Sequence, residues 1–432
     1  MNTLRRDLPV SFPLLCTINN GIFFEGAVKV NMGRPLQSEK PGFAMAIVLL
    51  TIVILLAMGT GLLGLGLHSR IFAIRNASEI AAQCAADAGL AKAVFEMNEK
   101  LKVKPWDDSI LPEATDESLP NCGATFSYTV TGDIDNGYIV ESIGSYGRAE
   151  KRVSCTLPLQ GPFEYAIFTV GGVELKNSAT VDWYNYGDDE ENLKVGTNSI
   201  GSGDISLKNS AIIKGDVVVG VGGEPDVVID LGSSATITGE TFTLTARYEL
   251  TPVTVPEWLQ LLPSGGTIND STTITGSGKY DSIDLANAKT ITIDGAVTLY
   301  IIGDITLNNS SQLKIVDADT NPDASLTLYL GGDYEGKNSS NVNNLTKDPR
   351  KLKIYGLESC SSMDFKNSVD FYGTIYATDA DVIFYNSAEA FGAIIAKSFE
   401  QKNASTFYYD ASLREGSVDD ESAQFVVKGW SE

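Results

Sequence analysis

Acidic residues with spacings that could do chemistry occur in three stretches. In the first, Asp317, Asp319 and Asn321 follow the alternating pattern of the first ligands in an EF-hand calcium loop. Pro322 stands where that loop needs glycine for its bend, and Leu328 stands where it needs the bidentate glutamate. We therefore interpret this stretch as an acidic, solvated turn rather than a calcium site.

The second stretch holds Asp379 and Asp381, a spacing that suits the paired carboxylates of polysaccharide-cleaving β-helices. Residues two apart in a strand point to the same side, so both would share one face. Solvent-facing strand carboxylates have the same pattern, and we favour that interpretation. The third stretch, Asp188-Asp189-Glu190-Glu191, could gather calcium, although a charged loop fits it better.

Two aromatic pairs, Phe384-Tyr385 and Tyr408-Tyr409, could offer platforms on which a sugar stacks. Rings stacked on one another within the fold are the alternative, which we favour. His68 is the only histidine, so the chain after it has no Ser-His-Asp triad, Cys-His dyad or histidine zinc site. We therefore predict a protein that is not an enzyme, with no catalytic residue, no metal and no cofactor.

The five cysteines include no CxxC pair, so neither a zinc ribbon nor a thioredoxin-like site is indicated. Cys122 and Cys155 bracket one small segment and could form a disulfide outside the cytoplasm. Two free, buried thiols would give the same sequence, and the sequence leaves both interpretations open.

The chain that carries these residues is organised around the run from Phe43 to Leu67, which has no charged residue in 25 positions. As a helix at about 1.5 Å per residue it reaches roughly 37 Å, enough to cross a hydrocarbon core of about 30 Å. We predict a membrane-spanning helix rather than the buried core helix of a soluble domain. Its glycines at 59, 61, 64 and 66 would soften it or lie at helix interfaces.

Charge is distributed unevenly along the 432 residues, whose net charge is −23. Residues 1–42 carry five basic and three acidic side chains, so the remainder is strongly acidic. By the positive-inside rule, the N-terminus is cytoplasmic, and the long acidic part is periplasmic or at the cell surface. Such an acidic part would repel phosphates, so we predict no nucleic-acid partner.

Residues 1–42 are predicted to be a leader, with Met32 as the true start of translation. The helix is predicted to continue through residue 102, because 68–100 contain no proline and carry small apolar residues at helical spacing. Those small residues would allow close approach of another helix, of the protein's own domain, or of both along one length. They are Ile74, Ala77, Ala81, Cys84, Ala88, Ala91 and Phe95.

Residues 103–160 are predicted to hold a linker, from Lys104 to Pro120, and a small antiparallel β-meander. The expected strands are Thr125–Thr131, Tyr138–Ile143 and Arg152–Leu157. Residues 414–432 are predicted to be an acidic tail, with Asp419 and Glu421 among its charges. Its strand at Phe425-Val426-Val427 would pair back on the exported part.

Residues 161–413 repeat one phrase: an apolar residue, a spacer, asparagine and a small residue, at intervals of roughly 20 residues. Asparagine tolerates left-handed backbone angles and bonds its own backbone at sharp corners. We therefore predict a parallel β-helix (solenoid), with a β-sandwich as the alternative. The fold class is α+β: a long helix, a meander and this mostly-β domain. The corner asparagines are Asn177, Asn209, Asn287, Asn309, Asn367, Asn386 and Asn403.

The front of the chain resembles type IV pilins and, more closely, PilX-like pilus assembly proteins. The resemblance rests on Gly42 before Phe43, the apolar run, and Ala86-Asp87-Ala88-Gly89-Leu90, similar to that family's A-E-A-G-L. It implies cleavage by a prepilin peptidase after Gly42, with Phe43 as the mature N-terminus. Ile47 stands where most major pilins carry glutamate, which argues against a major shaft subunit.

The back of the chain is similar to the β-solenoid domain attached to PilX-like N-termini. The matching stretches are 181–184, 211–217, 373–377, 381–382 and 409–410. Together the two resemblances imply a minor pilin-like structural protein of a type IV pilus or secretion pseudopilus. The implied partners are the inner membrane, other pilins or pseudopilins, the peptidase, and a surface glycan or protein ligand for adhesion or assembly priming.

Two other functions remain as alternatives. One is a membrane-tethered polysaccharide-active β-helix enzyme, which would need the carboxylates at 379 and 381 in a cleft. The other is a membrane-anchored scaffold that is never processed.

Overall fold

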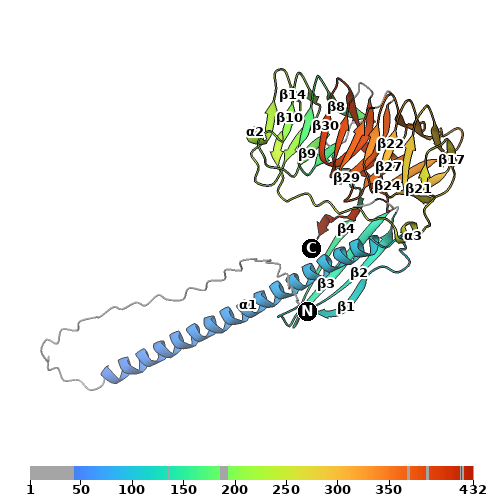
Figure 1. Ribbon diagram of the computed structural model, residues 1–432. Helices are drawn as coiled ribbons and strands as arrows, with labels where there is room; N and C mark the ends of the chain where they lie inside the picture. Colours follow the sequence, from blue (N-terminus) through green and yellow to red (C-terminus); the bar gives the residue numbers. More distant parts are fainter. Residues whose placement is uncertain are drawn as a thin grey trace, which may run out of the picture. The chain divides into compact units, whose positions relative to one another are not determined.

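The computed structural model describes residues 43–134, 136–184, 193–366, 370–385, 389–418, 420 and 423–431. The chain divides into two compact units, Met1–Phe72 and Ala73–Glu432, which are treated separately. One long helix, α1 (Phe43–Leu101), is followed by mostly β structure (Figure 1), so the α+β class is correct. The predicted leader, with Met32 and Gly42, lies outside the described residues.

In the first unit, α1 presents apolar side chains to its surroundings on every side. From Met45 to Phe72 all residues are exposed except Gly59 and Gly64, which are half-exposed. A Cβ added at any of the four glycines of this segment would meet nothing within 4 Å. Contacts within the chain therefore do not require glycine there. Among the described residues, α1 is the one helix long and apolar enough to cross a membrane.

In the second unit, the end of α1 packs on an antiparallel sheet in the order β1-β2-β3-β4-β33 (Figure 1). Gly144 makes this possible, because a Cβ there would lie 2.1 Å from the Ala82 carbonyl oxygen and 2.3 Å from the Ala86 nitrogen. Ser142 reinforces the contact by donating to the Ala86 carbonyl at 2.7 Å. The strands are β1 (Glu113–Ser118), β2 (Thr125–Asp133), β3 (Gly137–Tyr146), β4 (Ala149–Leu157) and β33 (Lys428–Ser431).

The helix face expected from the sequence is not the face that packs. The buried residues are Ala82, Ala85, Ala86, Gly89, Leu90, Ala93, Met97 and Leu101. Most of the expected face lies outward instead, with Ile74 58% and Phe95 63% exposed. Both stripes are small and apolar, so spacing alone could not decide between them. What decides is the close approach to Gly144, which only the alanine stripe allows.

The predicted linker contains a strand that the sequence analysis missed. β1 pairs with β2 in an antiparallel register from Glu113↔Thr129 to Ser118↔Thr125, with an irregularity in between. Its sequence is polar and mostly exposed because it forms the edge of the sheet. An apolar alternation is absent from such a strand, and this is why it was taken for a linker.

The rest of the second unit is a stack of short strands, in which each strand pairs in parallel with the strand three later in the chain. We call each set of three successive strands a rung. The first arm holds β6 (Ile167–Thr169), β7 (Val173–Leu175), β8 (Thr180–Tyr184), β9 (Lys194–Thr197), β10 (Ile205–Leu207), β11 (Ile212–Ile213), β12 (Asp216–Val219), helix α2 (Pro225–Val228), β13 (Ile229–Leu231), β14 (Thr236–Ile237) and β15 (Thr241–Thr243).

A second arm follows the same rule from β16 to β28. β27 and β28 then both pair with the long strand β29, and β29, β30 and β31 pair in succession. It holds helix α3 (Glu257–Gln260), β16 (Thr267–Ile268), β17 (Thr272–Ile274), β18 (Gly278–Tyr280), β19 (Ser282–Leu285), β20 (Thr290–Ile293), β21 (Ala296–Ile301), β22 (Ile305–Leu307), β23 (Gln312–Ile315), β24 (Ser325–Leu330), β25 (Tyr334–Gly336), β26 (Asn341–Asn344), η1 (Pro349–Lys351), β27 (Leu352–Gly356), β28 (Ser362–Phe365), β29 (Phe371–Phe384), β30 (Ala390–Gln401), β31 (Thr406–Asp410) and η2 (Ala411–Arg414).

The order of rungs in space is not their order in the chain. The last strands, β30 and β31, pair in parallel with the first, β6 to β8 (Figure 1). The first arm therefore runs outward from the middle of the stack to β15. The second arm starts with β16 at the opposite end and returns to the middle. One apolar interior runs through both arms, from Phe163 to Leu413.

Residues 244–256 begin the crossover between the two ends, and it is fixed at Tyr248 and Thr251. The Asn198 side chain exchanges two hydrogen bonds with the Tyr248 backbone, at 2.8 and 3.0 Å. The Tyr248 ring packs on Tyr165 and Phe168, with centroids 5.2 and 4.6 Å apart. The Tyr376 hydroxyl donates to the Thr251 carbonyl at 2.8 Å.

Four of the predicted corner asparagines have the expected left-handed backbone, whereas Asn403 does not and donates its amide to the Tyr385 carbonyl. At Asn177, Asn209, Asn287 and Asn309, φ lies between 52° and 58°, and the following residue is also left-handed. Side chains link successive corners: the Asn209 amide donates to Asn177 Oδ1 at 3.2 Å. A further corner, Asn338, has φ 53° and donates to Asn309 Oδ1 at 3.1 Å. Asn367 and Asn386 lie outside the described residues.

The tail pairs back on the rest of the chain in two short strands and not as the predicted strand 425–427, of which only Phe425 lies in a strand. β32 (Gln424–Phe425) pairs with β5 (Leu159–Gln160), and β33 pairs with β4, both antiparallel.

We expect Asn309→Ala to destabilise the stack by about 1 kcal/mol, because alanine has a Cβ in the left-handed region and no local hydrogen bond to offset it. Asn309→Gly should cost less. Hydrogen exchange of β22 and β25 amides would measure both. Asn343→Ala, in strand β26 with ordinary backbone angles, is the matched control. Equal losses for Asn309→Ala and Asn309→Gly would contradict the corner argument.

Candidate functional site

The junction between the first and last strands brings together two stretches quoted for the solenoid resemblance. In the β8–β31 register, Trp183 lies opposite Tyr409 and Tyr184 lies opposite Asp410. Pairing of 181–184 with 407–410 was not predicted, because a regular repeat gives no reason to join its first and last members. These residues therefore close the stack.

Arg414 packs against this junction from the start of the tail. Its guanidinium lies 5.2 Å from the Trp183 ring centroid and 5.6 Å from that of Tyr409. Burial raises the pKa of Tyr409 well above its usual range, and its hydroxyl donates to the Phe163 carbonyl at 2.6 Å. Tyr409 is thus a core residue and not a sugar platform.

Tyr408 belongs to an outward-facing aromatic row with Phe391 and Tyr372, which lie in register on adjacent strands. The Tyr372 and Phe391 rings are 4.4 Å apart with a 6° interplanar angle, and Phe391 and Tyr408 are 4.8 Å apart with 13°. Both faces of the Phe391 ring are therefore covered, and Tyr372 and Tyr408 each stack one face on it. A sugar needs a free ring face, so this row fits stacking within the fold.

The other aromatic pair, Phe384-Tyr385, also packs on residues within the fold. Phe384 is 7% exposed and stacks on Phe365 at 4.7 Å. Tyr385 lies between two cations, with Lys366 at 4.7 Å and Lys402 at 4.2 Å from its ring centroid.

The lysine of the recurring phrase forms a charge ladder along one face. Lys176 pairs with both Glu174 and Glu400, and Lys208 reaches Glu174 at 2.6 Å. Burial raises the pKa of Glu174, but the two lysines outweigh this, and its net pKa lies below the usual range. The sequence analysis missed this ladder, although the lysine before Asn177, Asn209, Asn367 and Asn403 was its signal. Lys337, Lys366 and Lys402 continue it with Glu335, Asp364 and Glu400.

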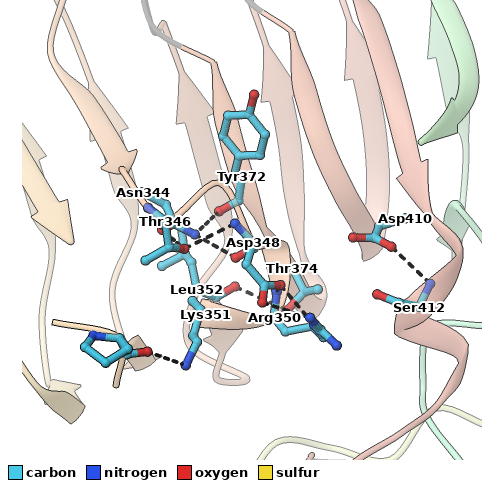
Figure 2. A network of polar contacts seen from close by, with 11 residues as sticks. Asn344, Thr346, Asp348, Arg350, Lys351, Leu352, Tyr372, Thr374, Asp410 and Ser412 are labelled. Carbon is cyan, nitrogen blue, oxygen red and sulfur yellow. Dashed lines mark hydrogen bonds and ion pairs between the residues drawn. The ribbon is translucent and has the colours of Figure 1, made fainter. Parts of the chain in front are cut away.

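The most connected polar cluster surrounds the loop between β26 and β27 (Figure 2). The Asn344 amide donates to the carbonyls of Asp348 and Tyr372, at 2.9 and 3.0 Å. Arg350 donates two guanidinium bonds to the Asp348 carboxylate, each at 3.0 Å. Burial raises the pKa of Asp348, yet the Arg350 bonds dominate and lower it overall. These hydrogen bonds brace the loop.

The paired aspartates of the sequence analysis lie on the surface of β29. Asp379 and Asp381 flank the buried Ala380 and both face outward, as alternation predicted. Asp381 accepts from the Ser398 hydroxyl at 2.6 Å and pairs with Lys397 at 3.3 Å. Asp379 accepts from the neighbouring Thr378 at 3.1 Å. One carboxylate is thus neutralised on the strand surface.

The EF-hand-like stretch is a turn held by its own amides. Thr320 donates to the Asp317 carboxylate at 2.7 Å, and hydrogen bonds from Thr320 lower the pKa of Asp317. Asn321 donates to Asp294 at 2.9 Å, and Leu328 is buried in β24. These contacts fit the solvated turn that we favoured. Asp188-Asp189-Glu190-Glu191 lies outside the described residues.

Across the described part of the chain, no group of three or more histidine, cysteine, aspartate or glutamate side chains could hold a metal. Cys84, Cys122, Cys155 and Cys360 are free thiols, so Cys122 and Cys155 are not joined. Phe43 is the first residue of α1.

Comparison with known proteins adds one family match. Residues 254–416, which cover the second arm, match a family described as a domain of unknown function (DUF7305). This is less than half of the chain, and none of the curated proteins matches.

Two solved structures were compared. The competence-associated pilin ComZ from Thermus thermophilus is 12% identical, covering 82% of this chain and 97% of its own, with a TM-score of 0.22. An ice binding protein from an Antarctic bacterium, Flavobacteriaceae, is 11% identical, covering 57% and 96%, with a TM-score of 0.21. Scores this low carry no argument about fold or function.

We expect Asp348→Asn to destabilise the stack by about 1 kcal/mol at neutral pH, the scale of a partly exposed charge-assisted pair. A lowered pKa in the folded state stabilises above the ordinary aspartate pKa, and the effect is lost as pH falls through the folded value. The difference from the native protein should therefore vanish in acid, which denaturant unfolding at several pH values would show. Asp319→Asn removes the same charge from an exposed turn. A difference that persists in acid would contradict this assignment.

Proposed function

We propose that this chain is a minor pilin-like structural protein that anchors by α1 and displays the stacked domain outside the cytoplasm. The observation that carries the proposal is the contrast between the two halves of α1. From Met45 to Phe72 apolar side chains are exposed, with Leu55 at 67% and Leu63 at 68%. From Ala82 onward one face is buried on the sheet. Exposing this much apolar surface to water is unfavourable, so the first half of α1 needs lipid or other apolar helices around it.

In this proposal the stacked domain is a parallel β-helix, and the domain boundaries are those predicted from the sequence. Parallel pairing between strands three apart supports a β-helix over a sandwich, as do the asparagine corners. The N-terminus lies in the cytoplasm, and the domain lies in the periplasm or on a pilus or pseudopilus at the cell surface. A surface glycan or protein is its proposed ligand.

We further propose that a prepilin peptidase cuts between Gly42 and Phe43 and that the cut protein joins other pilins or pseudopilins. The glycine directly before the uncharged apolar run that begins at Phe43 supports this cleavage point. Ile47, in place of the usual glutamate, supports a PilX-like minor role. The packed, hydrogen-bonded aromatic and carboxylate candidates support a structural protein over a polysaccharide-active enzyme.

The test is Gly42→Leu in the native host, with Gly33→Leu, which lies in the leader after Met32, as the matched control. We expect the precursor to keep its full size and to be lost from sheared pili or pseudopili, while the control is processed normally. Immunoblots and intact mass would measure both. Unchanged size and unchanged incorporation of Gly42→Leu would overturn the proposal and leave an unprocessed membrane scaffold.

A further inference from the structure

Two segments of chain pass side by side between the small sheet and the stack. One follows β4 and leads into the first arm, and the other leaves η2 and begins the tail. Gly161 donates its backbone N–H to the Arg414 carbonyl at 3.2 Å. A Cβ at Gly416 would lie 2.4 Å from the Gly161 Cα, so the two backbones leave no room for side chains.

The start of the tail is fixed to the stack. Leu413 is buried in the interior, and Arg414 packs on the rings of Trp183 and Tyr409. Farther along, Asp420 pairs with Lys353 of β27, and both side chains are largely buried.

The tail is fixed to α1 farther along, at Phe425. Asn98 donates its amide to the Phe425 carbonyl at 3.1 Å and accepts the Phe425 N–H at 2.7 Å. The Phe425 ring is 2% exposed and lies 5.5 Å from Trp106 and 5.2 Å from Tyr138. One helix side chain thus satisfies both backbone groups of a tail residue, as a neighbouring strand would.

We propose that residues 413–418, 420 and 423–431 form a strap that couples the stack directly to α1. A single covalent passage can swivel about its backbone dihedrals, whereas two antiparallel passages bonded to each other cannot do so independently. Load or rotation applied to the stack then reaches α1 through the Phe425–Asn98 contact as well as through the segment after β4. This inference does not depend on what the stack binds or on whether α1 enters a filament.

The test uses the full chain in detergent micelles with Asn98→Ala. Spin labels go on Cys84, which is exposed on α1, and on Thr273→Cys in β17, in a background of Cys16→Ser and Cys122→Ser. Cys155 and Cys360 are buried, and burial raises the pKa of Cys360 to about 12, so neither thiol should label. Asn76→Ala, at an exposed position of the same helix, is the matched control.

We expect one narrow distance distribution in the native protein and in Asn76→Ala, and loss of that narrow peak in Asn98→Ala. Hydrogen exchange at Phe425 and Lys428–Ser431 should rise about tenfold in Asn98→Ala, the scale of one or two lost hydrogen bonds. Exchange in β2 and β3 should stay unchanged, which shows that the sheet remains folded. Asn98→Asp keeps the acceptor but not the donor and should give an intermediate width.

Two results would overturn the strap. Unchanged tail exchange in Asn98→Ala would mean that Asn98 does not hold the tail. A distance distribution that stays narrow while the tail amides exchange faster would mean that the tail does not couple the stack to α1. If Asn98→Ala fails to fold, Lys353→Ala removes the contact between Asp420 of the tail and β27 instead. This variant must then broaden the distance distribution for the strap to stand.

Discussion

Parallel hydrogen bonding between the first and last strands of the stack is the interaction on which the rest of the second unit depends. β31 on β8, and β30 on β6 and β7, join strands whose residues lie more than 200 positions apart, such as Thr180 and Thr406. Without this contact each arm would end in an unpaired edge at the middle of the stack. Such distant pairing is expected to form slowly, because the entropy cost of closing the long loop comes before the hydrogen bonds and packing that offset it.

Closure also gathers the residues around it. Trp183 and Tyr409 face one another across the junction, and Arg414 covers both before the tail descends to Phe425. The junction and the strap are therefore continuous along the chain.

The sequence predicted those features that are local. Asn177 and its equivalents need left-handed angles wherever they occur, and Phe43–Leu67 is apolar whatever follows it. It did not predict β1, because an edge strand needs no apolar face, nor the buried face of α1, which Gly144 selects from the opposite sheet. The candidate carboxylates at 379 and 381 were placed correctly on one side of a strand. The contacts of Asp381 with Lys397 and Ser398 were hidden, because they depend on a neighbouring strand. The order of rungs was inaccessible for the same reason, since it depends on contacts between chain ends.

Closure of the stack is tested most directly by a cysteine pair, Thr180→Cys with Thr406→Cys, in protein that lacks Cys84 and Cys122. Adjacent strands lie about 4.8 Å apart, within the range that a disulfide spans. This pair should therefore cross-link rapidly under mild oxidation. Thr236→Cys with Thr406→Cys, which the register separates by two further strands, should not. Failure of the first pair to cross-link, or equal cross-linking of both, would contradict the closed stack.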